Sequence, residues 1–269
     1  MLNSYRQYFA LQKEPFASDI QRKEILETKT LTAVQDRIHY AMRLGGIALV
    51  TGEIGSGKST ALRYVIGGFH PSEYRIICVT ASSGSILELY RQILTELGVE
   101  NSGASRVNMT RRIKQEVLEW VTAKKMKIAL VIDEASLLRL EVFAELHTLT
   151  QFEQDSKPFL PIILAGQANL VDNLCYRNSQ PLASRVVARC HLTGIDLATM
   201  AEYLRHHLMI AGVKRMLFDE TAVTAIHQAS GGLFRKANHL ARGALVAAAK
   251  ADESMVLADH VRLAETEIF

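Results

Sequence analysis

Apolar and polar residues follow two different periods along the chain, and the change of period divides it. Up to about residue 195, short apolar runs of strand length alternate with longer stretches of helical periodicity. This alternation predicts a parallel α/β sheet covered by helices. The sheet is expected to have five strands, over residues 47–51, 75–80, 127–133, 161–166 and 188–192.

Beyond Asp196 the strand-like runs stop, while helical periodicity continues. Asp219 is a plausible N-cap for one of these helices, and Gly231-Gly232 marks a break between two others. The chain is therefore expected to fold as an α/β core over residues 1–195, including an N-terminal leader, followed by an all-helical lid over residues 196–269. Helices of the lid are expected over residues 197–211, 219–229, 234–251 and 257–267.

The segment between the first strand and the next helix fills every fixed position of the phosphate-binding loop, G-x-x-x-x-G-K-[ST]. Glycines let successive N–H groups point at phosphates, and the following helix adds its positive N-terminal end. Lys58 is expected to reach the β- and γ-phosphates, and Ser59 to ligate Mg²⁺. The sequence thus predicts ATP and Mg²⁺ as cofactors. The expected contact residues are Gly52, Glu53, Ile54, Gly55, Ser56, Gly57, Lys58, Ser59 and Thr60.

The third predicted strand ends in two acids, Asp133 and Glu134. An apolar strand that delivers acids at its carboxyl end is the usual partner of a phosphate loop. Asp133 is expected to hold the Mg²⁺ shell, and Glu134 to act as the general base towards the attacking water. The sequence therefore predicts an ATPase.

Gln167 follows the fourth predicted strand, Pro161–Gly166. In a parallel sheet this position lies beside the catalytic crevice. Gln167 is expected to orient the water or to contact the γ-phosphate. A simple polar cap at the end of the strand is the alternative interpretation.

Three arginines are candidates for contact with the phosphates. Arg185 and Arg189 lie just before and within the fifth predicted strand, and a guanidinium supplied by a neighbouring subunit strongly stabilises phosphoryl transfer. Arg185 is the preferred candidate, while Arg189 is equally compatible with a surface pair. Arg235 opens a lid helix, where the helix dipole disfavours a cation. An external anion is therefore expected near Arg235.

Composition limits the class of protein without identifying it. With 48% hydrophobic and 22% charged residues, the chain is typical of soluble globular proteins, and no apolar run approaches the roughly 20 residues that cross a bilayer. Its N-terminus lacks the layout of a signal peptide, so a cytoplasmic location is expected. Cys78, Cys175 and Cys190 lack C-x-x-C spacing and are expected to be reduced thiols.

The net charge of +3 permits binding to nucleic acid but does not require it. The basic residues form two groups along the sequence, and solvated helix faces are an equally good interpretation of both. The first group flanks Trp120 and comprises Arg106, Arg111, Arg112, Lys114, Lys124, Lys125 and Lys127; the second comprises Arg235, Lys236, Arg242 and Lys250.

These motifs together resemble those of the AAA+ superfamily, and more narrowly those of the ExeA-like ATPases. The resemblance spans nearly the whole chain. Its most specific parts are the leader with Pro15-Phe16, the Gly166-Gln167 pair and the S-G-G-x-x-R segment. It covers a leader at 8–16, a helix with a glycine pair at 33–46, the loop at 51–59, Gly166-Gln167, an arginine box at 185–192 and a lid segment at 230–238.

The resemblance assigns further roles. It implies that the loop around Pro15 and Phe16 flanks the adenine. The chain departs from the family at Phe234, where a proline usually precedes the lid arginine, and this leaves the start of the helix at Arg235 less certain. The catalytic set implied by the family is Lys58, Glu134 as the catalytic glutamate, Gln167 as sensor 1, Arg185 as trans arginine finger and Arg235 as sensor 2.

Two biological roles accompany this resemblance. Longer relatives serve type II secretion and carry a membrane span and a peptidoglycan-binding domain, which are not present in this sequence. Stand-alone ATPases of the MuB, TnsC and IstB type direct transposition. We therefore expect a homo-oligomeric ring or filament that forms with ATP, binds duplex DNA and acts on a transposase. A secretion-complex partner and a non-hydrolysing adaptor are the alternatives.

Overall fold

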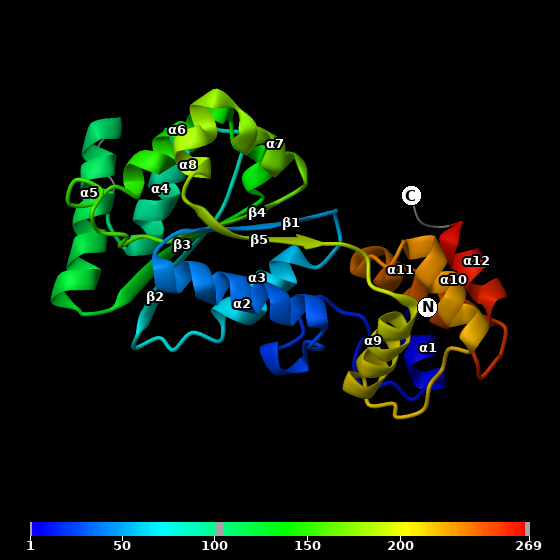
Figure 1. Ribbon diagram of the computed structural model, residues 1–269. Helices are drawn as coiled ribbons and strands as arrows, with labels where there is room; N and C mark the ends of the chain where they lie inside the picture. Colours follow the sequence, from blue (N-terminus) through cyan, green and yellow to red (C-terminus); the bar gives the residue numbers. More distant parts are fainter. Residues whose placement is uncertain (1, 101–104, 267–269) are drawn as a thin grey trace. The chain divides into compact units, whose positions relative to one another are not determined.

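The computed structural model describes residues 2–100 and 105–266, and its internal contacts form two compact units (Figure 1). We call Lys29–Gly52 with Lys58–Leu192 the sheet unit. Met1–Thr28, Glu53–Gly57 and Thr193–Phe269 form the helical unit. By its contacts, the N-terminal leader groups with the C-terminal helices. The division of the sequence after residue 195 stays a prediction.

The sheet unit contains five parallel strands in the order β2-β3-β4-β1-β5, which confirms the predicted fold class. All six residues of β1 are buried at the centre of the sheet, as expected for an apolar strand covered on both faces. The strands are β1 (Ile47–Gly52), β2 (Tyr74–Thr80), β3 (Lys127–Asp133), β4 (Ile162–Gly166) and β5 (Val186–Leu192).

The register of the strands gathers the chemically important positions at one edge of the sheet. Thr51 of β1 pairs with Gly166 of β4, and Thr80 of β2 pairs with Asp133 of β3. Because all the strands run in the same direction, the segments that follow β1, β3 and β4 leave the sheet at its carboxyl edge. This edge is where open α/β sheets bind ligands.

Helices cover both faces of this sheet (Figure 1). α2 and α3 lie against one face, whereas α4 to α8 share a large buried apolar core with the other. The helices are α2 (Lys29–Leu44), α3 (Lys58–Ile66), α4 (Ile86–Leu97), α5 (Arg106–Leu118), α6 (Leu140–Leu149), α7 (Asn169–Cys175) and α8 (Gln180–Ala183), with short turns η2 (Glu119–Ala123), η3 (Ala135–Leu137) and η4 (Arg177–Ser179).

The strands begin within two residues of their predicted positions, and two other boundaries in the sheet unit are informative. Helical periodicity predicts a helix over residues 141–153, but α6 ends at Leu149, and a turn bridged between Phe152 and Lys157 follows. The loop predicted over residues 98–107 ends earlier, because α5 begins at Arg106; residues 101–104 of that loop lie outside the described part. Periodicity cannot detect a chain reversal whose residues are themselves compatible with a helix.

The helical unit is built from short helices that share one apolar core. Asp196 and Asp219 cap two of them by accepting hydrogen bonds from Thr199 N and Ala222 N, both at 2.7 Å. No described helix is both long enough and apolar enough to traverse a bilayer. The helices are α1 (Leu2–Tyr8), η1 (Arg22–Glu24), α9 (Leu197–Ile210), α10 (Glu220–Ser230), α11 (Phe234–Lys250) and α12 (Ala258–Glu265).

The Gly231-Gly232 break is a tight packing point. Gly231 ends α10 in a left-handed conformation with φ 61°, and Gly232 also has a positive φ. A Cβ atom on Gly232 would lie 2.3 Å from the Ile195 carbonyl oxygen, so only glycine fits there. The break therefore fixes how α11 starts relative to the segment before α9.

Candidate functional site

Lys58 is the first residue of α3 and is nearly buried, with 6% of its surface exposed. Its Nζ donates a hydrogen bond to the carbonyl oxygen of Gly52, 3.0 Å away. A lysine is seldom buried unless its charge is satisfied. The ammonium group is therefore held at the end of β1, and its contact with phosphates stays a prediction.

The middle of the phosphate loop, Glu53–Gly57, packs on the first turn of α11 within the helical unit. Gly55 and Gly57 have φ values of 84° and 95°, which L-residues rarely adopt. A Cβ on Gly55 would lie 2.8 Å from the Cβ of Arg235, and one on Gly57 would lie 3.2 Å from the Phe234 ring. Arg235 N also donates to the Gly55 carbonyl oxygen at 3.2 Å. The predicted sensor arginine thus starts a helix in contact with the loop.

Two other residues of the loop are informative. The Ser56 hydroxyl oxygen is buried and has no hydrogen-bond partner within residues 2–100 and 105–266. A buried polar atom without a partner is costly and often marks a site for a ligand. In contrast, Ile54 is 61% exposed, and Glu53 is exposed too. The loop therefore has one orphaned polar atom that a phosphate oxygen could satisfy.

The two predicted metal ligands lie together. Ser59 Oγ donates to Asp133 Oδ2 at 2.7 Å, and the other oxygen of Asp133 accepts from Glu134 N at 2.8 Å. Ser59 opens the helix after the loop, and Asp133 ends β3. A hydroxyl with one carboxylate suits Mg²⁺, which keeps several waters and takes its other ligands from phosphates. In the described residues no cluster of three or more His, Cys, Asp or Glu side chains suggests an all-protein metal site.

Glu134 has a left-handed backbone, with φ 53° and ψ 31°. This conformation is uncommon for a residue other than glycine and is often found at functional sites. It turns the chain sharply from β3 into η3, and Leu137 N of η3 donates a 2.9 Å hydrogen bond to the Glu134 carbonyl oxygen. The side chain is half-buried at the carboxyl edge of the sheet.

Gln167 is brought to the same turn. Its backbone N donates to Ser136 Oγ at 3.3 Å. A Cβ on Gly166 would lie 2.8 Å from Ser136 N, so the Gly-Gln pair allows the end of β4 to approach the η3 turn closely. The structure therefore brings Gln167 close to the turn that presents Glu134. Its catalytic role stays a prediction.

Arg185 is engaged within its own chain. Its Nη2 donates to both oxygens of Asp155, at 2.6 Å and 2.5 Å, and approaches His147 Nε2 at 3.3 Å. Arginine can only donate, so His147 Nε2 accepts here and carries no proton. Burial, followed by the charge of Arg185, lowers the pKa of His147, while the hydrogen bond from Arg185 lowers the pKa of Asp155.

Arg189 differs from Arg185 in its surroundings. It is exposed on β5, an edge strand that pairs only with β1 in the described sheet. Its carbonyl oxygen accepts a 2.7 Å hydrogen bond from Arg37 Nε, which ties α2 to the strand. Which of the two arginines acts towards a neighbouring subunit stays a prediction.

Pro15 and Phe16 are both buried in the helical unit. The Phe16 ring is 1% exposed and stacks on His207 of α9, with 5.3 Å between centroids. Arg242 donates to the Phe16 carbonyl oxygen at 3.0 Å and lies 3.1 Å from Glu14. The Phe16 ring is thus a core side chain that positions the leader, and the predicted adenine contact is untested. Arg242, part of the second basic group, has a structural role in the same place.

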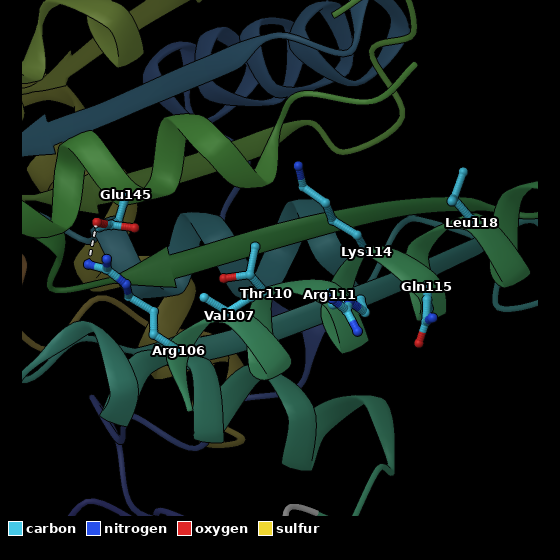
Figure 2. A pocket seen from close by; sticks show the side chains of 8 residues that line it. All are labelled: Arg106, Val107, Thr110, Arg111, Lys114, Gln115, Leu118 and Glu145. Carbon is cyan, nitrogen blue, oxygen red and sulfur yellow. Dashed lines mark hydrogen bonds and ion pairs between the residues drawn. The ribbon is translucent and has the colours of Figure 1, made fainter. Parts of the chain in front are cut away.

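Three residues of the first basic group, Arg106, Arg111 and Lys114, line a groove of about 500 Å³ along α5 (Figure 2). Arg106 forms a 2.7 Å ion pair with Glu145 at one end, and Lys114 donates to the Gln151 carbonyl oxygen at 2.9 Å. Burial lowers the pKa of Lys114. Arg111 makes no ion pair or hydrogen bond with any described residue. The group is less charged towards solvent than its sequence suggests.

Some contacts around these residues could not be predicted from sequence. Asp155 lies 30 positions from Arg185, just beyond the helix predicted over residues 141–153, and no motif links the two. Likewise, the bonds from Thr51 Oγ1 to His191 Nδ1 at 2.9 Å and to the Cys190 carbonyl oxygen at 3.4 Å join two strands below the phosphate loop. Only the parallel pairing of β1 with β5 brings these residues together.

Comparison with known proteins supports the presence of an AAA domain in this chain. Residues 42–174 match the AAA domain family. General secretion pathway protein A of Aeromonas hydrophila is 29% identical over 266 residues, which cover 98% of this chain and 48% of that protein. ATP-dependent target DNA activator B of Escherichia phage Mu is 26% identical over 171 residues, covering 61% of this chain and 48% of that protein. The chain spans about half the length of these relatives.

Solved structures share the fold at low sequence identity. Cdc6p from Pyrobaculum aerophilum superposes with a TM-score of 0.73 at 14% identity, covering 94% of this chain and 70% of that one. The Aeropyrum pernix ORC1 protein, solved in complex with DNA, gives 0.66 at 18% identity, covering 94% and 68%. These similarities show the fold, a parallel sheet covered by helices with a helical C-terminal region.

Proposed function

Since the chain carries an AAA domain and the fold of the AAA+ P-loop ATPases, we propose that it binds ATP with Mg²⁺ and hydrolyses it in an assembly of identical subunits. AAA+ proteins in general hydrolyse nucleotides and act as oligomers. The observation that carries the proposal is the 2.7 Å contact between Ser59 and Asp133 beside a complete phosphate loop with a buried lysine. This donor set fits Mg²⁺ and a triphosphate.

The residues of the chain divide the chemistry among them. Backbone N–H groups of residues 52–60 and the Lys58 ammonium would hold the phosphates, and Ser59 and Asp133 would hold the Mg²⁺, which would supply charge neutralisation. Glu134 accepts a proton from the attacking water. Gln167 orients that water, and Arg235 contacts the γ-phosphate from the start of α11. Pro15 and Phe16 keep the leader beside the adenine.

Arg185 makes hydrolysis depend on a second subunit. A guanidinium has the fork geometry and permanent charge that stabilise a phosphoryl group in its transition state. When it is supplied by the neighbour, an isolated subunit binds ATP but turns it over slowly. Nucleotide state and assembly state are then linked, because ATP stabilises the assembled form and its loss weakens that form.

A mixing experiment tests this shared site. The variant Glu134→Gln keeps Arg185 but lacks the base, and Arg185→Ala keeps the base but lacks the arginine. Each variant alone should hydrolyse ATP at least about a hundredfold more slowly than the native protein, because a general base and an arginine finger each accelerate the reaction by at least about this factor. An equimolar mixture should recover a substantial part of the native rate, because the first variant serves the site of the second. Failure of the mixture to recover any activity would exclude a trans role for Arg185.

We infer that duplex DNA is the main partner of the assembly, and that the protein selects a transposition target or activates a transposase. Support comes from the similarity to the phage Mu target DNA activator and from the basic residues along α5. Binding of this kind would rest on phosphates, show little sequence preference and weaken steeply with salt.

Assistance to a secretion complex is the second candidate. It is favoured by the similarity to general secretion pathway protein A, which extends over 98% of this chain. The two candidates differ in one measurement. The first requires ATP-dependent, salt-sensitive affinity for duplex DNA, whereas the second requires ATP-dependent binding to a secretion-complex protein and indifference to DNA.

A further inference from the structure

The turn that follows α6 has an unusual backbone. Glu153, Gln154 and Asp155 have φ values of 45°, 58° and 71°, three consecutive left-handed residues without a glycine. Each such residue is disfavoured for an L-amino acid. The turn is closed by a bridge between Phe152 and Lys157. Its conformation therefore needs compensation from the contacts that it makes.

The principal polar contact of this turn with the rest of the sheet unit is the pair formed by Asp155 and Arg185. One guanidinium nitrogen, Nη2, donates to both carboxylate oxygens. The Nε of the same guanidinium is buried and has no hydrogen-bond partner in the described part of the chain. The Arg185 side chain is 24% exposed and that of Asp155 is 45% exposed. The pair can therefore be approached from solvent.

We propose that Asp155 is an internal competitor for Arg185, which holds the arginine until the triphosphate of a neighbouring subunit replaces the carboxylate. This proposal rests on the trans role of Arg185 proposed above. We call the contact the Arg185–Asp155 latch. With the latch closed, the carboxylate offsets the charge of the guanidinium and occupies its Nη2 donor. The arginine then acts on a phosphate only after the exchange.

The exchange is physically reasonable, because carboxylate and phosphate oxygens compete for the same N–H donors. A partly exposed ion pair is weakly held in water, whereas a triphosphate presents several charges. His147 remains beside the guanidinium as a neutral acceptor and does not compete by charge. The latch therefore raises the protein concentration at which subunits assemble and hydrolyse ATP.

The variant Asp155→Asn tests the latch, because asparagine keeps the shape, tolerates left-handed φ and removes the charge. It should reach half-maximal ATPase rate at a protein concentration about two- to fivefold lower than the native protein, the size of change expected from a partly exposed ion pair. Its plateau rate should equal the native one. Asp155→Gly, which has no left-handed penalty, should behave alike and guards against a folding defect.

Glu153→Gln is the matched control, because it neutralises an acid on the same turn. The Glu153 side chain makes no hydrogen bond or ion pair with a described residue. This variant should leave the dependence of the ATPase rate on protein concentration unchanged. If the pair had a purely structural role, Asp155→Asn would need a higher protein concentration for half-maximal ATPase rate or would reach a lower plateau rate. An unchanged concentration dependence in Asp155→Asn would also overturn the latch. The proposed function fails separately, if Arg185→Ala keeps full activity.

Discussion

At the scale of single residues, the backbone conformation of Glu134 determines where its carboxylate is presented. Its left-handed conformation follows directly on β3, and Asp133 accepts a hydrogen bond from its backbone N. One oxygen of the Asp133 carboxylate thus accepts from the Glu134 amide, while the other accepts from Ser59 Oγ. Because of this arrangement the two acids at the end of the strand serve different purposes. In the proposed mechanism the first acid holds the Mg²⁺ and the second turns towards the attacking water.

Replacing Glu134 by Gln should therefore separate binding from turnover. Loss of the base is expected to lower the rate of ATP hydrolysis by about 10² to 10⁴. The affinity for ATP with Mg²⁺ should change little, because Lys58, Ser59 and Asp133 remain. Steady-state turnover and fluorescent-nucleotide titration measure the two effects.

Glu141→Gln, on the exposed surface of α6, is the control and should behave as the native protein. Unchanged turnover in Glu134→Gln would instead support the adaptor interpretation, in which ATP only stabilises the fold.

At the scale of elements, the N-terminal leader and α9 depend on a buried imidazole. His207 lies in α9, is 3% exposed, and packs between Phe16 and Tyr203, with ring centroids 5.3 Å and 4.5 Å away. Burial, with a smaller contribution from His206, lowers the pKa of His207 to about 4. The leader is therefore held by a side chain that must stay neutral.

The helical unit should lose stability as the pH falls. Because the pKa of His207 is depressed in the folded state, its contribution is fully present above the unfolded value of about 6.5 and is lost as pH falls towards about 4. The difference is about 3 kcal/mol. Chemical denaturation between pH 7 and pH 4, followed by circular dichroism, measures it.

His207→Gln, which cannot take up a proton, should flatten that pH dependence while lowering stability at pH 7. His239→Gln replaces an exposed histidine of α11 and should retain the native pH profile. If the free energy of unfolding changed equally with pH in the native protein and in His207→Gln, groups other than His207 would govern the loss of stability in acid.

At the scale of the whole molecule, the proposed binding to DNA depends on how many cations remain available once the chain has folded. Along α5, Arg106 and Arg112 are paired with Glu145 and Glu116, and Lys114 is bound to a backbone carbonyl. Arg111 has no such partner among the described residues. We therefore expect Arg111 to make the strongest phosphate contact of this group.

The variant Arg111→Ala should weaken ATP-dependent binding to duplex DNA and reduce the slope of log K against log salt by about one, since it removes one phosphate contact. The ATPase rate without DNA should be unchanged. Arg91→Ala removes an exposed arginine from the neighbouring helix α4 and is the charge-matched control.

Native protein that shows no salt-sensitive duplex affinity with ATP would contradict the DNA role and leave assistance to a secretion complex. A native-like slope in Arg111→Ala would place the DNA contacts elsewhere on the molecule.

Sequence patterns predicted the local part of the fold well. The strand that ends in Asp133 and the helix N-cap at Asp219 appear where the pattern places them, because apolar runs and caps act within a few residues. Periodicity was wrong after Leu149, where the predicted helix gives way to a left-handed turn. A turn that is stabilised by a distant partner leaves no such local trace.

By itself the sequence determined that this chain has a phosphate loop, an acid pair at the end of a strand and an α/β core, because each is encoded by neighbouring residues. Only the tertiary structure decided that Asp155 binds Arg185, that the Phe16 ring is buried against His207, and that three of the four α5 cations are bound to other groups of the chain. These contacts join residues far apart in the chain. Their existence depends on strand order and helix packing, which bring side chains together without any local pattern.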